Sequence, residues 1–168
     1  MKRFLLTGIA VMLSMVVGLA SNMAGTNFAG SWALDKAKSE GLPQQMANAD
    51  FTWIITQDDK MIKIEVKRNP EGQMGPGQPT VYNLDGSETT AEITGRMTGK
   101  AKRKAKWLDG GKILELNTVS DLEMQGQAFQ TTSMDHLELA EGGKMLKVHR
   151  VSENPRGKQD YKMVFNKQ

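Results

Sequence analysis

The chain has 168 residues, a formal net charge of +3 and no cysteine. The lack of cysteine excludes a disulfide framework and any thiolate metal or redox site, so the fold has to rest on its apolar core. If the first 20 residues are removed as a secretory leader, about 148 residues remain, which is enough for one domain with a single core.

The first 20 residues have the pattern of a secretory leader. Met1-Lys2-Arg3 is a short basic start, and residues 4–20 form an uncharged, mostly apolar run. Small residues, Gly18 and Ala20, stand at the −3 and −1 positions, so we expect cleavage after Ala20 and a periplasmic or secreted protein. The alternative is an uncleaved membrane anchor, for which the run is near the lower length limit. The expected division is residues 1–20 as signal peptide and residues 21–168 as one domain, not an integral membrane protein once processed.

Removal of the leader takes away Lys2 and Arg3 and lowers the net charge from +3 to +1. A nearly neutral chain gives no support to nucleic-acid binding, and no nucleic-acid partner is expected. The only dense basic run, residues 100–106, puts its four lysines at alternate positions of a strand. That spacing is typical of a solvated strand face; a phosphate or membrane-surface patch is the alternative.

The expected elements are almost all strands. Phe28–Leu34 alternates and predicts a first strand, and a loop over residues 36–49 contains a short helix starting near Pro43, because the first helical turn accepts proline. Further strands are expected near residues 51–57, 61–69, 80–85, 88–94, 100–108, 112–120, 127–139, 144–152 and 159–166. No long helical pattern separates any two of them, so the fold class is all-β, a single antiparallel up-and-down meander of about ten strands.

The turn sequences predict how the meander closes. Asp109-Gly110-Gly111-Lys112 recurs as Glu141-Gly142-Gly143-Lys144, with Asp58-Asp59 as a looser copy, and each precedes an apolar alternation typical of a hairpin. Tight links there and at Asp85-Gly86-Ser87 alternate with links expected to be longer, at residues 36–50, 70–79, 95–99, 121–126 and 153–158. All long loops would then lie at one end, which favours a closed barrel with a mouth, because closure removes exposed edges.

Hairpin register predicts an apolar inner face beside three of the turns. The predicted inward pairs are Trp107 with Leu114, Ala105 with Leu116, Arg103 with Thr118, Leu139 with Leu146, Leu137 with Val148, Asp135 with Arg150, Ile55 with Ile62, Trp53 with Ile64, and Phe51 with Val66. On the outer face, Lys106 meets Glu115 and Glu138 meets Lys147.

Phe28-Ala29-Gly30-Ser31-Trp32-Ala33-Leu34 resembles the opening strand of the calycins, where lipocalins carry G-x-W and fatty-acid-binding proteins carry F-x-G-x-W-x-L. The stretch from Gly30 to Ser39 also looks like the start of secreted bacterial lipocalin-like proteins. The resemblance implies a lipocalin-like barrel, with one short helix between the first two strands and Trp32 plugging the closed end. The last strand departs from the fatty-acid-binding type: Gln159 stands where the family has the arginine that holds a carboxylate, if Tyr161 is the matching tyrosine.

No motif in the chain indicates catalysis. G-x-S-x-G, H-E-x-x-H and a phosphate loop are all absent from the sequence, so we expect no enzyme and no cofactor. The two histidines, His136 and His149, are predicted to face each other on the outer surface. A structural metal site normally wants four ligands, and nothing nearby completes the set, so no metal site is predicted.

The candidate ligand site lies on the inner face near the mouth, where Arg68, Arg103 and Arg150 are expected to point inward. An unpaired buried guanidinium is costly, so each needs a partner. Arg150 has Asp135 across the strand pair, whereas Arg103 faces only Thr118. The hypothesis is that Arg103, helped by Arg68, grips the acidic head of an amphipathic ligand. Its apolar tail would lie along Phe51, Trp53, Leu116, Leu137 and Val148.

Two alternatives stay open at this point. Arg103 could reach the mouth and be solvated there, with its stem packed on Ala101 and Ala105. The whole protein could also be an envelope interaction or structural module with a packed interior and no small-molecule ligand. The sequence favours a non-catalytic exported barrel that binds a small hydrophobic or amphipathic ligand, with no protein partner identified.

Overall fold

The computed structural model describes residues 25–69 and 78–168, so the expected signal peptide and most of the loop from Pro70 to Pro79 lie outside the described residues. The elements are β1 (Gly30–Leu34), α1 (Gln44–Ala47), β2 (Asp50–Gln57), β3 (Met61–Asn69), β4 (Thr80–Asn83), β5 (Thr89–Ile93), β6 (Thr98–Leu108), β7 (Ile113–Met124), β8 (Gln127–Ala140), β9 (Met145–Asn154) and β10 (Gly157–Lys167). Within these described ranges no helix is both long and apolar enough to cross a bilayer.

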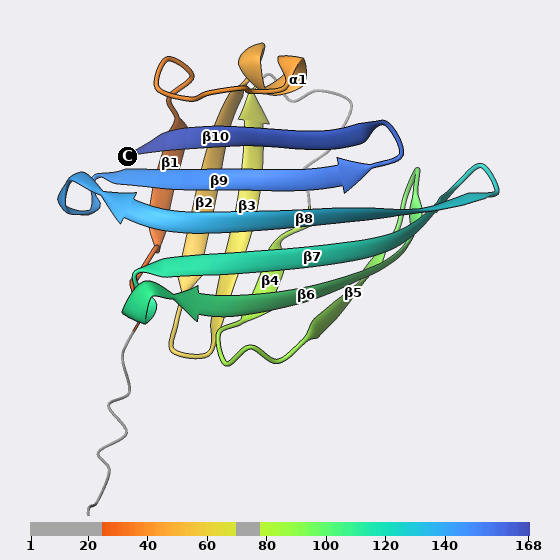
Figure 1. Cartoon of the computed structure of the whole chain (residues 1–168), viewed down its shortest axis with the longest axis horizontal. Helices are drawn as coiled ribbons and strands as arrows, with labels where there is room; N and C mark the ends of the chain where they lie inside the picture. The colour runs from red at the N-terminus through yellow and green to blue at the C-terminus, as the bar shows by residue number, and fades with distance from the viewer. Residues whose placement is uncertain (1–24, 70–77) are drawn as a thin grey trace, which may run out of the picture.

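The ten strands form one antiparallel sheet in the order β4-β3-β2-β1-β10-β9-β8-β7-β6-β5. Figure 1 shows β6–β10 lying across β1–β4, with α1 over one end. Pairing of β1 with β10, Trp32 opposite Lys167, joins the two halves. Strands β4 and β5 are the two edges, linked where the Thr89 hydroxyl donates to the Val81 carbonyl at 2.9 Å. The predicted fold is therefore confirmed: an all-β meander, curled into a nearly closed barrel, with one short helix between β1 and β2.

The two repeated turns set the register of four long strands. Asp109, Gly110 and Gly111 all have positive φ (44°, 62° and 88°), and Glu141, Gly142 and Gly143 repeat this (50°, 66° and 84°). A run of left-handed residues closes a tight turn, and glycine takes that conformation without the Cβ clash of other residues. The predicted pairs in β6–β7 and β8–β9 are confirmed, including Arg103 with Thr118 and Asp135 with Arg150.

The predicted register of β2 with β3 was wrong by two residues. Ile55 pairs with Ile64, Trp53 with Val66 and Phe51 with Arg68. The cause is the turn: the Asp58 N–H donates to the Met61 carbonyl at 3.0 Å, and the Asp58 carboxylate accepts hydrogen bonds from the backbone N–H groups of Lys60 and Met61, both at 2.8 Å. The turn is therefore centred on Asp59-Lys60 instead of Asp58-Asp59. A shift of two keeps every side chain on its predicted face.

Two links expected to be long are also tight turns. Met124 pairs with Gln127 across Gln125-Gly126, and Asn154 pairs with Gly157 across Pro155-Arg156. Gln125 and Gly126 have φ of 53° and 79°, the left-handed pair of a two-residue hairpin. Strands β7 to β10 are therefore longer than predicted. We call the barrel end beside the Asp109 and Glu141 turns the turn end, and the opposite end the open end.

The apolar core fills the turn end. Trp32 is fully buried there, as predicted, and its indole N–H donates to the Phe28 carbonyl at 2.9 Å. The Phe28 ring stacks on Trp107 at 6.1 Å between centroids, and Trp53 packs on Phe165 at 4.9 Å. Each large apolar side chain buried in this way stabilises the fold by roughly 1.5–3 kcal/mol. The Gln57 side chain ties the segment before β1 across the base, through hydrogen bonds to the Phe28 N–H and the Thr26 carbonyl.

Candidate ligand site

Along the strands the inner wall changes from apolar to polar with distance from the turn end. The first two inward steps of the β6–β7 and β8–β9 hairpins are apolar, and the third is polar in both. Polar side chains from six strands meet at this level because their hairpins are in matching register. We call them the polar band: Tyr82, Arg103, Thr118, Asp135, Arg150 and Tyr161.

Arg150 is held by Asp135 as the sequence predicted. Its Nε and Nη2 donate to the two Asp135 carboxylate oxygens at 2.5 and 2.6 Å, a bidentate pair. Burial alone would lower the pKa of Arg150, but the charge and hydrogen bonds of Asp135 outweigh it and raise that pKa above its ordinary value. The guanidinium also lies 5.7 Å from the Trp53 ring centroid. Asp135, only 3% exposed, is therefore committed to Arg150.

A second polar contact crosses the barrel. The Tyr82 hydroxyl on β4 and the Thr118 hydroxyl on β7 are 2.8 Å apart, although their strands are not neighbours in the sheet. Burial raises the pKa of Tyr82, so the phenol is neutral at physiological pH. Thr118, which the sequence placed opposite Arg103, is thus engaged by Tyr82.

Arg103 and Arg68 are the two arginines without such compensation. The Nε atom of each is buried and has no hydrogen-bond partner in the structure. Ala101 and Ala105 flank the Arg103 stem on β6 and are buried, while the Arg68 guanidinium lies 5.7 Å from the Phe51 ring centroid. A buried donor left unsatisfied costs about 1–3 kcal/mol, so both positions favour an acceptor from outside the chain.

The residues predicted to hold an apolar tail divide into two groups. Phe51 is half-buried beside Arg68, near the open end. Trp53, Leu116, Leu137 and Val148 belong to the core; Leu137 is 0% exposed, so no water-sized space adjoins it. A tail could reach these four side chains only by displacing core packing, and their role in ligand binding stays a prediction.

Sequence reasoning missed the wall beyond the polar band. Ser120, Thr131, Ser133 and Ser152 share the inner face there, and Ile93, Leu122 and Phe129 follow toward the open end. Val66, which faces inward opposite Trp53 and one step nearer the turn end than Arg68, is 38% exposed. The alternation of the strands contained the signal, but the predicted strand over 112–120 ended before Leu122.

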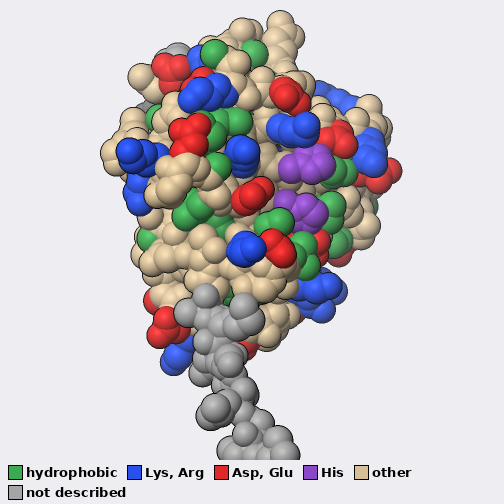
Figure 2. Space-filling model, turned by 60° about the vertical axis from the view of Figure 1, so that its left-hand side comes forward, with side chains coloured by type: hydrophobic (Ala, Val, Ile, Leu, Met, Phe, Trp, Pro, Cys, Tyr) green, Lys and Arg blue, Asp and Glu red, His purple; other side chains and the backbone are tan. Residues whose placement is uncertain are grey.

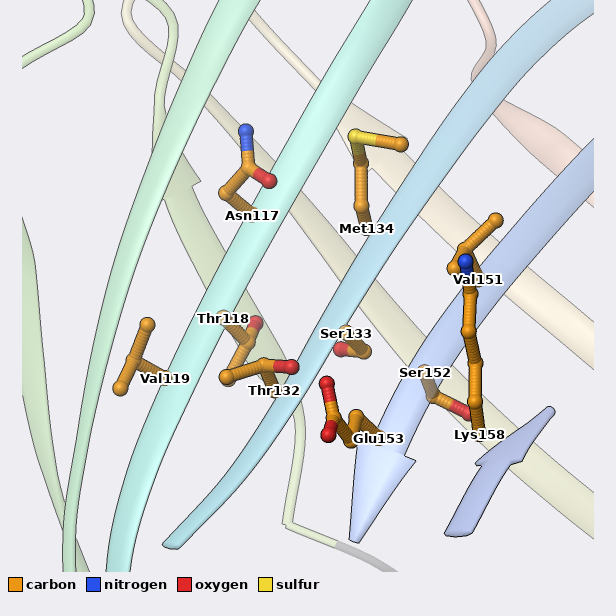
Figure 3. Close-up of a pocket in the computed structure, with 10 residues that line it drawn as sticks. All are labelled: Asn117, Thr118, Val119, Thr132, Ser133, Met134, Val151, Ser152, Glu153 and Lys158. Carbon is orange, nitrogen blue, oxygen red and sulfur yellow. The ribbon is translucent and has the colours of Figure 1, made fainter. Parts of the chain in front are cut away.

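The outer face of β7–β10 carries separate features. A hollow of about 270 Å³ is lined mainly by outward side chains, among them Val119, Met134 and Val151 (Figure 3).

His136 and His149 lie side by side on the same outer face (Figure 2), with ring centroids 6.4 Å apart. The Nε2 atom of His136 contacts Glu115 at 2.9 Å, and that of His149 contacts Asp160 at 2.8 Å. The His136 hydrogen bond lowers the pKa of Glu115. Among the described residues, no three His, Asp or Glu side chains are arranged to hold a metal ion.

No protein-family model and no curated protein matches the chain. Several solved structures are similar to it, among them the following three. A secretory abundant heat soluble protein from Ramazzottius varieornatus is 15% identical, with 83% of this chain and 94% of that chain covered and a TM-score of 0.49. The REP1-NXSQ fatty acid transporter is 18% identical, with 83% and 95% covered and a TM-score of 0.47.

The third is the zebrafish ileal bile-acid-binding protein, solved in complex with cholic acid. It is 14% identical, with 84% of this chain and 98% of that chain covered and a TM-score of 0.51. Identity at this level speaks for the fold alone. The chain therefore shares the barrel fold of that protein, in agreement with the resemblance of its opening strand.

Proposed function

We propose that this protein is a non-catalytic, exported barrel that holds a small amphipathic anion in its interior. The observation that carries the proposal is the pair of inward arginines, Arg68 and Arg103, whose buried Nε atoms lack acceptors. Asp135 neutralises Arg150, so it leaves the other two charges uncompensated. A planar guanidinium can grip a carboxylate or phosphate with two hydrogen bonds, which would satisfy what the chain leaves unsatisfied.

The proposed ligand lies in the outer half of the barrel. Its acidic head meets Arg103 and Arg68, and its apolar part extends along Phe51 toward the open end, where Leu122 and Phe129 face inward. A barrel of the same fold has been solved with cholic acid, so the fold accommodates a bile acid. Export rests on the leader pattern of residues 1–20 and places the ligand in the periplasm or outside the cell.

One observation favours the alternative, an envelope interaction module without a ligand. The turn end is solid, and the hollow on the outer face of β7–β9 has apolar walls at Val119, Met134 and Val151. In that function Arg103 is solvated at the mouth and its charge needs no partner.

Intrinsic fluorescence separates the two functions. Trp53 lies beside Arg150 in the polar band, so a ligand bound there should change its emission. Titration with decanoate and cholate is expected to saturate, and Arg103→Met should weaken binding by about 10-fold or more through loss of a charge-assisted contact. Arg156→Met, in the exposed turn before β10, is the matched control. No saturable response, or equal affinity in Arg103→Met, would leave the interaction module as the better reading. Native mass spectrometry of protein from its own source would show a co-purifying ligand.

A further inference from the structure

The inner face beyond the polar band is rich in hydroxyl groups. Thr118 pairs with Ser133, Ser133 with Ser152, and Ser120 with Thr131, so five hydroxyl side chains lie next to one another on three adjacent strands. We call this patch the hydroxyl wall. It begins beside Arg103, because Thr118 is the residue directly opposite Arg103 on β7. Leu122 and Phe129 border it toward the open end.

The hydroxyl wall does not suit an apolar tail. A hydroxyl covered by hydrocarbon loses its water and gains no hydrogen bond, which costs about 1–3 kcal/mol. The Thr118 hydroxyl is hydrogen-bonded to Tyr82. Within the described part of the chain, the hydroxyl groups of the other four residues, Ser120, Thr131, Ser133 and Ser152, form no hydrogen bond with another protein group. Four donors are therefore free to meet an oxygen-rich part of a ligand.

The interior charge sets how negative that part should be. Arg68, Arg103 and Arg150 face inward, and among the described inward side chains Asp135 is the one acid. Two positive charges remain once Arg150 is paired. A carboxylate offers one negative charge and two oxygens, whereas a phosphate monoester offers about 1.5–2 negative charges and three terminal oxygens.

We propose that Arg103, Arg68 and the hydroxyl wall bind a phosphate monoester, the head group of the amphipathic anion inferred above. This inference rests on the proposed function and names its ligand class. The phosphate lies against Arg103 and Ser133, Arg68 reaches it from the opposite wall, and the apolar remainder points past Leu122 to the open end. A serine wall supplies O–H donors to phosphate oxygens, and the arginines supply charge-assisted N–H donors.

Calorimetry with three probes tests the head group: octyl phosphate, octanoate and glycerol 3-phosphate. We expect octyl phosphate to bind at least about 10-fold more tightly than octanoate near pH 7.5. The preference should shrink as the pH falls through about 6, where a phosphate monoester loses its second charge. Ser133→Ala/Ser152→Ala should weaken octyl phosphate several-fold and leave octanoate nearly unchanged. Thr132→Ala is the matched control, since Thr132 precedes Ser133 in β8 and successive residues of a strand point to opposite faces of the sheet.

The outcomes separate this inference from the proposed function. Equal affinity for octyl phosphate and octanoate would overturn the phosphate head group and leave the amphipathic carrier standing. Binding of neither octyl compound, with none by glycerol 3-phosphate, would overturn both. Glycerol 3-phosphate binding as tightly as octyl phosphate would support the phosphate site and identify free phosphate esters, not lipids, as its source. An undiminished preference in Ser133→Ala/Ser152→Ala would exclude the hydroxyl wall.

Discussion

Asp135 and Thr118 give two inward arginines opposite roles. Asp135 holds Arg150 through two hydrogen bonds, at 2.5 and 2.6 Å, and makes that guanidinium part of the fold. Arg103 stands at the same step from its own turn, but its partner Thr118 carries no charge and is bonded to Tyr82. A single carboxylate therefore decides which arginine is structural and which can meet a ligand.

Removing that carboxylate should destabilise the fold. Asp135→Asn leaves Arg150 without a counter-charge. Breaking a fully buried ion pair typically costs about 3–5 kcal/mol, but the Arg150 side chain is 28% exposed, so we expect the free energy of unfolding to fall by about 2–3 kcal/mol. Urea unfolding followed by circular dichroism measures it. Asp135→Leu/Arg150→Met, which replaces both charges by apolar groups, should recover most of the loss. A single variant as stable as the wild type would contradict the structural role of the pair.

Glu115 should make a pH-dependent contribution to stability. The hydrogen bond with His136 lowers its pKa in the folded state below the ordinary 4.5. Its contribution is therefore present above about pH 4.5 and is lost as the pH falls through the folded-state pKa. Glu115→Gln should cost about 0.5 kcal/mol near pH 6, with the difference vanishing at strongly acid pH. A difference that grows on acidification would show that Glu115 is not stabilised as a carboxylate.

At the scale of the hairpin, sequence reasoning succeeded where glycines dictate the turn. Gly110 and Gly142 take left-handed backbone angles, and the registers of β6–β7 and β8–β9 follow from them. It failed where a side chain shapes the turn: the Asp58 carboxylate holds two backbone N–H groups, and the β2–β3 turn is centred on Asp59-Lys60 instead of Asp58-Asp59. Alternation reports which face a residue takes, but not on which residues the turn is centred.

The candidate site was predictable to the same extent. Alternation put Arg68, Arg103 and Arg150 inside and paired Arg150 with Asp135, and the structure has all four on the inner face. The Tyr82 contact with Thr118 could not be predicted, because it joins β4 and β7, which become close only when the sheet curls.

Gly99, in β6, occupies a position where no residue with a side chain fits. Its φ is +154°, and a Cβ there would lie 2.0 Å from the Asp121 carbonyl oxygen on β7. Gly99→Ala should therefore cost about 3 kcal/mol and loosen the β6–β7 pairing. Gly95→Ala is the control: its φ is +120°, but nothing lies within 4 Å of a Cβ, so only about 1 kcal/mol of backbone strain is expected. Thermal unfolding should rank the two variants, and equal losses would show that the close approach to β7 is unimportant.

At the scale of the whole molecule, the turn end of the barrel is solidly packed, and this limits the size of the proposed ligand. Leu114, Leu146 and Phe165 are fully buried at the turn end, whereas Val66, which faces inward opposite Trp53, is 38% exposed. A ligand that keeps the core intact therefore occupies only part of the barrel length. A short or bulky amphiphile fits that space better than a long straight chain.

Export predicts a defined mature terminus. With the leader cleaved after Ala20, protein recovered from the periplasm or culture medium should begin Ser21-Asn22-Met23. Intact mass and N-terminal sequencing measure this. An intact Met1 on protein from the cell envelope would refute cleavage and favour the anchor, and Ala20→Asp should block processing if the predicted site is used.

The pairing of the first strand with the last has a kinetic consequence. Trp32 on β1 lies opposite Lys167 on β10, and the Gln168 N–H donates to the Ser31 carbonyl at 2.9 Å. Contacts this distant in sequence form late, because a long segment must first be ordered, and all-β chains of high contact order refold in milliseconds to seconds. Until β10 is in place, β1 is an unprotected edge able to pair with another chain. If a chaperone prevents such intermolecular pairing during folding, β1 is the segment that it would need to protect.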